Sequence, residues 1–145
     1  MIERKQKLRP TELILIALED IIEAFQRLDL SPQAAAMVAV QHLKHNVIPL
    51  VLVFGYCGMP MIWGLAERSI SHIHNTKLTT WYLPEPVAIE GVTAGSSITY
   101  VDDAFIEDTS HSIEQSAASY RAAARAVFNT QKAINDEKSV HWVEN

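Results

Sequence analysis

The feature that most constrains this chain is a β-branched and aromatic run, Ile98 to Val101, that ends in the adjacent carboxylates Asp102 and Asp103. A polar segment (104–111) follows, and then a helical pattern rich in alanine. This strand–loop–helix order is the one in which α/β folds place ligands at the carboxyl end of a strand. The sequence therefore predicts that Asp102 and Asp103 bind ribose hydroxyls or Mg²⁺.

The composition is that of an ordinary globular protein. The 145 residues fit one domain (1–145), with 48% hydrophobic and 20% charged residues. A net charge of −5 argues against nucleic acid or an anionic membrane as a partner, because either favours a basic patch. No apolar run reaches the length of a membrane span, and the basic N-terminal stretch lacks the apolar core of a signal peptide. Cys57 is the only cysteine, so we expect no intrachain disulfide and a cytoplasmic location.

The N-terminal segment (11–45) is predicted to be helical. Apolar residues recur at three- and four-residue steps over Leu13–Leu28 with charges between them, as in an amphipathic helix with a solvated face. The pair Ser31-Pro32 predicts the N-cap and first position of a second helix that runs to about Lys44.

An α/β core is predicted over 47–130. The continuously apolar run Val47–Phe54 is typical of a strand covered on both faces, and a third helical pattern follows through Ile70. Further strands are expected over Thr76–Leu83 and Ala88–Gly91.

The alternation of helices and buried strands predicts an α/β fold with a mainly parallel sheet flanked by helices. Right-handed crossovers would place Val47–Phe54 beside Ile98–Val101. In the last helix, Arg121 and Arg125 are assigned to the solvated surface, although they could face an acid elsewhere. The polar tail (135–145) is left open between a short strand, a docking segment and partial disorder. The apolar stripe of the last helix comprises Ile113, Ala117, Tyr120, Ala124, Val127 and Phe128.

A turn of Gly55, Tyr56, Cys57 and Gly58 joins the predicted strand to the third helix. Such a turn lets backbone N–H groups approach a phosphate, although tight turns also need glycine for steric reasons alone. No histidine or acid lies near Cys57 in the sequence to activate its thiol, which argues against a nucleophile.

Together these segments resemble the type I phosphoribosyltransferase family, and the orotate phosphoribosyltransferases most of all. The likeness rests on the strand, turn and helix of Val47–Ala66, on Ile89–Gly91 followed by Ala94-Gly95, and on Tyr100–Asp103. The resemblance implies a phosphoribosyltransferase-like domain. Its glycine turn would contact pyrophosphate, and its two acids would hold the ribose hydroxyls with Mg²⁺.

The segment after the acidic pair departs from the family pattern. The family has a loop rich in threonine and glycine that wraps a phosphate, whereas 104–111 has no glycine and two further carboxylates. These negative charges oppose phosphate binding unless a metal intervenes. Thr109, Ser110 and Ser112 remain as candidate hydroxyl donors, and the order Ser112-Ile113-Glu114-Gln115 predicts a capping box at the helix start.

A second departure concerns basic residues. The orotate enzymes carry them on the segment that matches Trp81–Pro86, where this chain has no lysine or arginine to stabilise departing pyrophosphate. These departures favour a catalytically degenerate protein that binds a nucleotide, a sugar phosphate or a protein partner in a regulatory role.

Two alternatives stay open, and with them the question whether the chain is an enzyme. One is an active Mg²⁺-dependent phosphoribosyltransferase acting on a nucleobase-like substrate, with Asp102 and Asp103 at the ribose. The other is a small metal-dependent hydrolase in which the acidic loop over 102–111 holds Mg²⁺ or Mn²⁺. The non-functional alternative to this hydrolase is an acidic surface loop that binds nothing.

A homodimer is also expected. Aromatic and methionine side chains crowd the start of the third helix and the segment near Trp81, and such residues are enriched at interfaces. The residues concerned are Met59, Met61, Ile62, Trp63, Trp81 and Tyr82.

Overall fold

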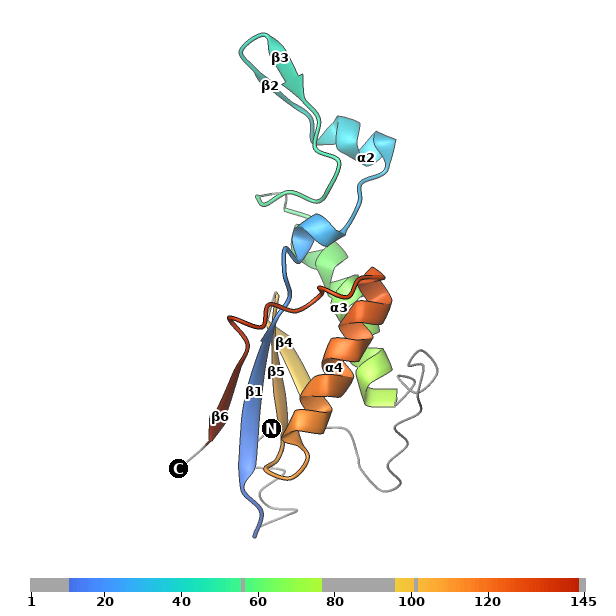
Figure 1. The fold of residues 1–145 in the computed structure, drawn as a ribbon. Helices are drawn as coiled ribbons and strands as arrows, with labels where there is room; N and C mark the ends of the chain where they lie inside the picture. The colour runs from blue at the N-terminus through green and yellow to red at the C-terminus, as the bar shows by residue number, and fades with distance from the viewer. Residues whose placement is uncertain (1–10, 56, 77–95, 101, 144–145) are drawn as a thin grey trace. The chain divides into compact units, whose positions relative to one another are not determined.

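The computed structural model describes residues 11–55, 57–76, 96–100 and 102–143. The chain, expected to be one domain, divides into two compact units (Figure 1). Unit 1 comprises the chain up to Ile22 and from Glu67 onward, and unit 2 comprises Glu23–Ala66. Helix α3 (Met59–Thr76) contributes to both units. No helix in the described ranges is long and apolar enough to cross a membrane.

Unit 1 is built on a four-stranded sheet in the order β4-β5-β1-β6. Strand β1 lies between β5 and β6, and all three pairings of the sheet are antiparallel. In the register, Ala17 of β1 lies opposite Ile106 of β5, and both side chains are fully buried. The strands are β1 (Ile14–Asp20), β4 (Ser96–Tyr100), β5 (Asp103–Thr109) and β6 (Val140–Val143).

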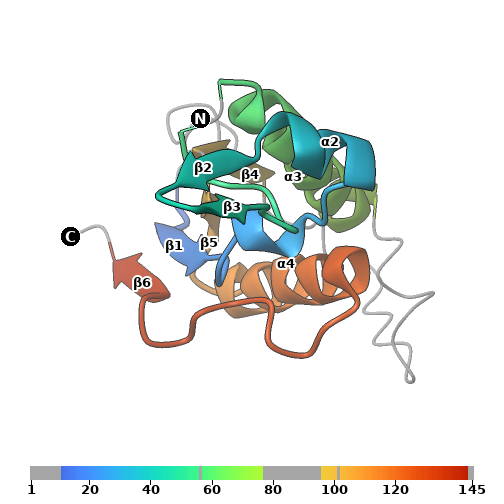
Figure 2. The same ribbon diagram turned by 90° about the horizontal axis from the view of Figure 1, so that it is seen from above.

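Helix α4 (Ile113–Phe128) packs on the sheet face that carries these two side chains (Figures 1 and 2). Four residues of its predicted apolar stripe, from Ile113 to Ala124, are buried, which confirms the helix and its inner face. The helix ends at Asn129, which adopts the left-handed conformation that asparagine tolerates at this position. The ring of His74 on α3 lies 5.8 Å from that of Tyr120, so α3 packs beside α4 within unit 1.

Unit 2 has a small aromatic core and little regular structure. The ring of Phe25 lies 4.9 Å from that of Phe54 and 5.5 Å from that of Trp63, and Leu52 is buried nearby in the same unit. The N-cap side chain of Ser31 accepts a hydrogen bond from the Ala34 N–H at 3.2 Å, as predicted for this helix start. Its elements are η1 (Phe25–Arg27), α2 (Pro32–Met37), the hairpin strands β2 (Val40–His42) and β3 (His45–Val47), and the start of α3.

The predicted α/β fold with a mainly parallel sheet is wrong, because every strand pair in the described residues is antiparallel. The strand after Ser96 is confirmed as β4, but it does not lead through a loop to the helix. A tight turn at Asp102 sends the chain back as β5, so 103–109 is a strand and not a phosphate loop. A tight turn enforces antiparallel pairing, since parallel strands need a crossover of a dozen residues or more.

The first predicted helix is also wrong, because its apolar run forms strand β1. Six consecutive apolar residues, Leu13–Leu18, fit the helical period and a buried strand equally well. Pairing on both sides of the strand satisfies the hydrogen-bonding groups of its backbone. Glu19 and Asp20 then point to opposite faces of the sheet instead of sharing one solvated helix face.

The predicted strand Val47–Phe54 is wrong as well. Only Val47 belongs to a strand, and β3 lies in a two-stranded sheet separate from β4. Proline at 49 lacks the N–H that a central strand needs. The second helix ends at Met37 and not near Lys44, because a hairpin follows it.

The remaining predictions concern the third helix, the C-terminal tail and two further strands. The third helix is confirmed as α3, and the C-terminal tail forms the short strand β6. The predicted strands over Thr76–Leu83 and Ala88–Gly91 lie, apart from Thr76, outside the described residues.

Candidate functional site

The two acids predicted to hold a ribose lie at one end of the unit 1 sheet. Asp102 occupies the β4–β5 turn, and Asp103 opens β5 directly opposite Asp20 of β1. Burial and the negative charges of Asp102 and Asp20 raise the pKa of Asp103, whereas Lys138 lowers it. The Lys138 ammonium lies 3.7 Å from an Asp20 oxygen.

This acidic end has the charge to attract a cation. Within the described part of the chain, however, no group of three or more His, Cys, Asp or Glu side chains is arranged to hold a metal ion. Binding of Mg²⁺ by Asp102 and Asp103 stays a prediction.

The predicted hydroxyl donors lie at the opposite end of β5. Six residues separate Asp103 from Thr109, which is roughly 20 Å along a strand. The hydroxyls of Thr109 and Ser112 are 2.7 Å apart and hydrogen-bond to each other. Ser112 is the N-cap of α4 as predicted, but its side chain makes no capping bond. Ser110 is exposed, and its backbone N–H donates to the Leu13 carbonyl at 2.9 Å.

Asp108, expected in a phosphate loop, is instead a buried structural carboxylate. It accepts the Thr109 N–H at 2.8 Å and the Ser116 hydroxyl of α4. It thereby ties the end of β5 to the first turns of the helix.

The glycine turn belongs to unit 2 and thus to a different unit from the acids. Gly55 has φ of +92°, a conformation that side-chain-bearing residues rarely adopt, so glycine is required there. Cys57 is exposed, and Tyr56 lies outside the described residues. The Gly58 carbonyl accepts a hydrogen bond from the Ile62 N–H in the first turn of α3. A phosphate at this turn stays a prediction.

The interior of unit 1 holds an ion pair that the sequence interpretation missed. Glu19 is fully buried, and the Arg121 Nε donates to its two carboxylate oxygens at 3.0 and 2.9 Å. Ser139 donates its hydroxyl to the same carboxylate at 3.1 Å. Burial lowers the pKa of Arg121, but the hydrogen bond and charge of Glu19, with Asp136 and Glu114, outweigh this, so the pKa lies above its ordinary value.

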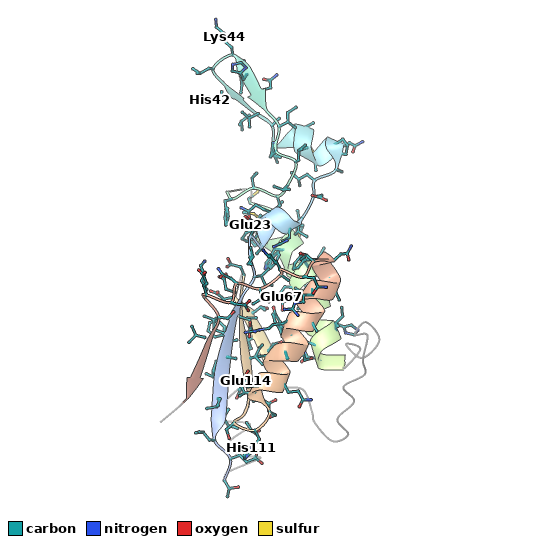
Figure 3. The ribbon with its side chains drawn as sticks, in the orientation of Figure 1. Glu23, His42, Lys44, Glu67, His111 and Glu114 are labelled. Atoms are coloured by element: carbon teal, nitrogen blue, oxygen red, sulfur yellow. The ribbon has the colours of Figure 1, made fainter. Side chains whose placement is uncertain are left out.

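Tyr120 lies next to this pair on α4. It is fully buried, and among the described residues its hydroxyl has no hydrogen-bond partner. Burial, together with the charges of Glu67 and Glu19, raises the pKa of Tyr120 far above its ordinary value. Glu67 itself accepts the Ser71 hydroxyl at 2.6 Å (Figure 3). The Glu19 carboxylate, with Arg121 and Ser139, therefore cross-links elements of unit 1, whereas the Tyr120 hydroxyl is buried beside it.

Unit 2 presents the opposite feature, a concentration of exposed apolar side chains. Among the described residues of this unit, nine large hydrophobic side chains are at least half exposed, reaching 82% for Leu43 and 83% for Met37. Of the residues from which a dimer was expected, Met61 belongs to this set, whereas Met59 and Trp63 are buried in the core. The nine are Met37, Val40, Leu43, Val47, Ile48, Leu50, Phe54, Met61 and Leu65.

A small hollow lies within unit 2. Its volume is about 80 Å³, and it is lined by the apolar residues Leu30, Ala34, Met37, Val38, Leu52, Val53 and Ile62.

Comparison with known proteins places the chain in no family. No family model matches it, and no curated protein matches it. The resemblance to the type I phosphoribosyltransferases therefore stays a prediction from the sequence, and the parallel sheet that it implied is not found.

Two signals in the sequence could have revealed the features that were missed. A carboxylate directly after six consecutive apolar residues, as Glu19 is, indicates a buried acid in need of a cation. In unit 2, Pro49 interrupts the apolar run over 47–54, which indicates that the run is not one continuous buried strand.

Proposed function

We propose that this chain is an assembly module that self-associates through the exposed apolar side chains of unit 2. The observation that carries the proposal is that the exposed apolar side chains gather in unit 2. Of the 13 large hydrophobic side chains exposed in the described residues, nine lie in unit 2, which contains 44 of the 145 residues. Scattered exposed apolar residues are normal in any protein, but such a concentration in one small unit indicates an interaction surface.

The size of the surface supports a protein partner. Nine large side chains that are half exposed or more present an area on the order of the ~800 Å² that each partner buries in a standard interface. A unit of 44 residues is also close to the limit of roughly 40 below which folding needs a disulfide, a metal or association. The single cysteine, Cys57, is exposed and free.

The hollow in unit 2 favours a protein over a small molecule. Ligand pockets usually have volumes of roughly 300–1,000 Å³ and a few polar groups that orient the ligand. The hollow of about 80 Å³ has an apolar lining and suits one anchoring side chain of a partner.

Charge favours a second copy of the chain as that partner. Unit 2 carries two acids, Glu23 and Asp29, and two bases, Arg27 and Lys44, so its net charge is zero with histidine neutral. The whole chain has a net charge of −5, all of which therefore belongs to unit 1. Two copies repel each other least when unit 2 takes part in the contact.

Sedimentation velocity of the full chain tests the proposal. The wild type should sediment at a multiple of its 16.2 kDa mass at micromolar concentration. The double variant Leu43→Glu with Leu50→Glu should sediment as a monomer, whereas Leu13→Glu, an exposed apolar residue of unit 1, should behave as the wild type. A monomeric wild type, or a double variant that associates normally, would overturn the proposal.

A further inference from the structure

Unit 1 exposes an apolar row on the sheet face that α4 does not cover. Ile98, Phe105, Leu18 and Val140 are neighbours in register across β4, β5, β1 and β6. Side chains alternate between the two faces of a strand, so these four lie on the side opposite the buried Ala17. Ile98, Phe105 and Val140 are 50%, 37% and 38% exposed, and Leu18 is half-buried.

The row is bordered by negative charge. Asp20 and Asp103 lie on the same face, two residues along β1 and β5 from the apolar row, and Asp102 follows in the adjoining turn. Lys138 is the cation near Asp20, at 3.7 Å, so this end of the sheet has three acids against one base. Mutual repulsion of the three acids would be relieved by a further cation brought by a partner.

The β2–β3 hairpin of unit 2 has the complementary character. Val40 lies opposite Val47, and His42 lies opposite His45, so the four side chains share one face, and all six strand residues are exposed. The turn adds Leu43 and Lys44, and the segment Val40–Val47 contains no acid. Figure 3 shows His42 and Lys44 at the free end of the hairpin. A two-stranded hairpin alone in water is marginally stable, so this one gains from a surface to pack on.

We infer that the hairpin of one copy docks on this exposed apolar row of a second copy, with its basic end beside Asp102 and Asp103. The inference rests on the proposed self-association and specifies its contact. A hairpin-to-hairpin contact would bring two Lys44 side chains together, and a sheet-to-sheet contact would bring two sets of acids together. Only the hairpin-to-sheet contact pairs opposite charges and joins apolar surface to apolar surface. Because the two surfaces differ, the contact is heterologous and repeats from copy to copy into a ring or a chain.

Complementation between two single variants of the full chain tests this contact. Leu43→Glu alters the hairpin and leaves the sheet face intact, whereas Ile98→Glu alters the exposed row on the edge strand and leaves the hairpin intact. Each variant alone should sediment as a monomer. An equimolar mixture should form 1:1 pairs, because the intact hairpin of the second variant still fits the intact face of the first. Gln41→Glu, on the opposite face of the hairpin, is the matched control and should associate as the wild type.

The outcomes separate the inference from the proposed function. If the wild type associates and Ile98→Glu does so equally well, the sheet face takes no part and the inference is overturned while self-association stands. The inference is equally overturned if both variants are monomeric and their mixture does not pair. A monomeric wild type overturns both. Val140→Glu at the other edge of the row repeats the test, and circular dichroism identifies any variant that fails to fold.

Discussion

The two units of this chain differ in which side chains they bury. In unit 1, the carboxylates of Glu19 and Asp108 are buried, and each is matched by hydrogen bonds from other elements of the unit. In unit 2, large apolar side chains such as Met37 and Leu43 are more than four-fifths exposed. A unit that satisfies buried charges has closed its interior, whereas a unit that leaves apolar side chains in water is complete only with a partner. This difference supports the proposal that the exposed side chains of unit 2 seek a partner, whereas unit 1 supplies a closed and stable interior.

The stability of unit 1 should be most sensitive to loss of Arg121, the cation that pairs with the buried Glu19. Arg121→Ala leaves Glu19 buried without its ion-pair partner, so the free energy of unfolding should fall by about 3–5 kcal/mol. Arg125→Ala, one turn further along α4 and exposed, is the control and should change it by less than about 0.5 kcal/mol. Urea unfolding measures both. Equal effects of the two variants would mean that the ion pair does not stabilise unit 1.

The buried Tyr120 hydroxyl should show that unit 1 also carries an unfavourable group. Tyr120→Phe removes a buried hydroxyl that has no hydrogen-bond partner in the described residues. The free energy of unfolding at pH 7 should therefore rise by about 1 kcal/mol. A destabilised Phe variant would show that the hydroxyl is hydrogen-bonded in solution.

The same variant should change the response of stability to alkali. The native pKa of Tyr120 is raised, so above the ordinary pKa of roughly 10 the unfolded chain releases a proton that the native state retains. The stability linked to this group is therefore complete below pH ~10 and is lost as pH rises further. Urea unfolding from pH 9 to 11 should show a steeper fall for the wild type than for Tyr120→Phe. Parallel curves would contradict the raised pKa.

The smallest effect is expected at the acidic end of the sheet. The pKa of Asp103 is raised, so its carboxylate opposes folding once pH exceeds that pKa, and the opposition vanishes below the ordinary value of 3.8. Asp103→Asn should therefore raise the melting temperature slightly at pH 7, by less than about 0.5 kcal/mol in stability because solvent screens the site. A lower melting temperature would mean that the carboxylate stabilises the turn.

The same site allows the sequence-based prediction of a metal to be tested. If Asp102 and Asp103 bind Mg²⁺, the ion should raise the melting temperature of the wild type and leave Asp102→Asn with Asp103→Asn unchanged. Equal shifts in both proteins, or no shift in either, would argue against this metal site.

The sequence predicted helices well where one period dominated. The Ala-rich pattern after Ser112 and the pattern after Gly58 are the helices α4 and α3. It failed where a run was apolar throughout, because Leu13–Leu18 satisfies both periods and only its pairing partners decide between them. Pairing with β5 and β6 depends on residues about 90 and 125 positions away, which no local pattern records.

The predicted site failed to assemble for the same reason. Asp103 and Thr109 were assigned to one ligand site, but the strand between them holds them roughly 20 Å apart. The expected burial was wrong for charged and apolar residues alike. Glu19 was assigned to a solvated face and is buried, whereas Val47 and Leu50 were assigned to a core and are exposed. Local hydrophobicity indicates what could be buried, and only the tertiary contacts decide what is.

Amide hydrogen exchange of the full chain at low and high protein concentration tests most directly whether unit 2 is completed by a second copy. We expect amides of the hairpin strands Val40–Val47 to exchange markedly more slowly at the high concentration, whereas amides of α4 should exchange equally at both. Hairpin amides that exchange at the same rate at both concentrations would show that the hairpin takes no part in self-association.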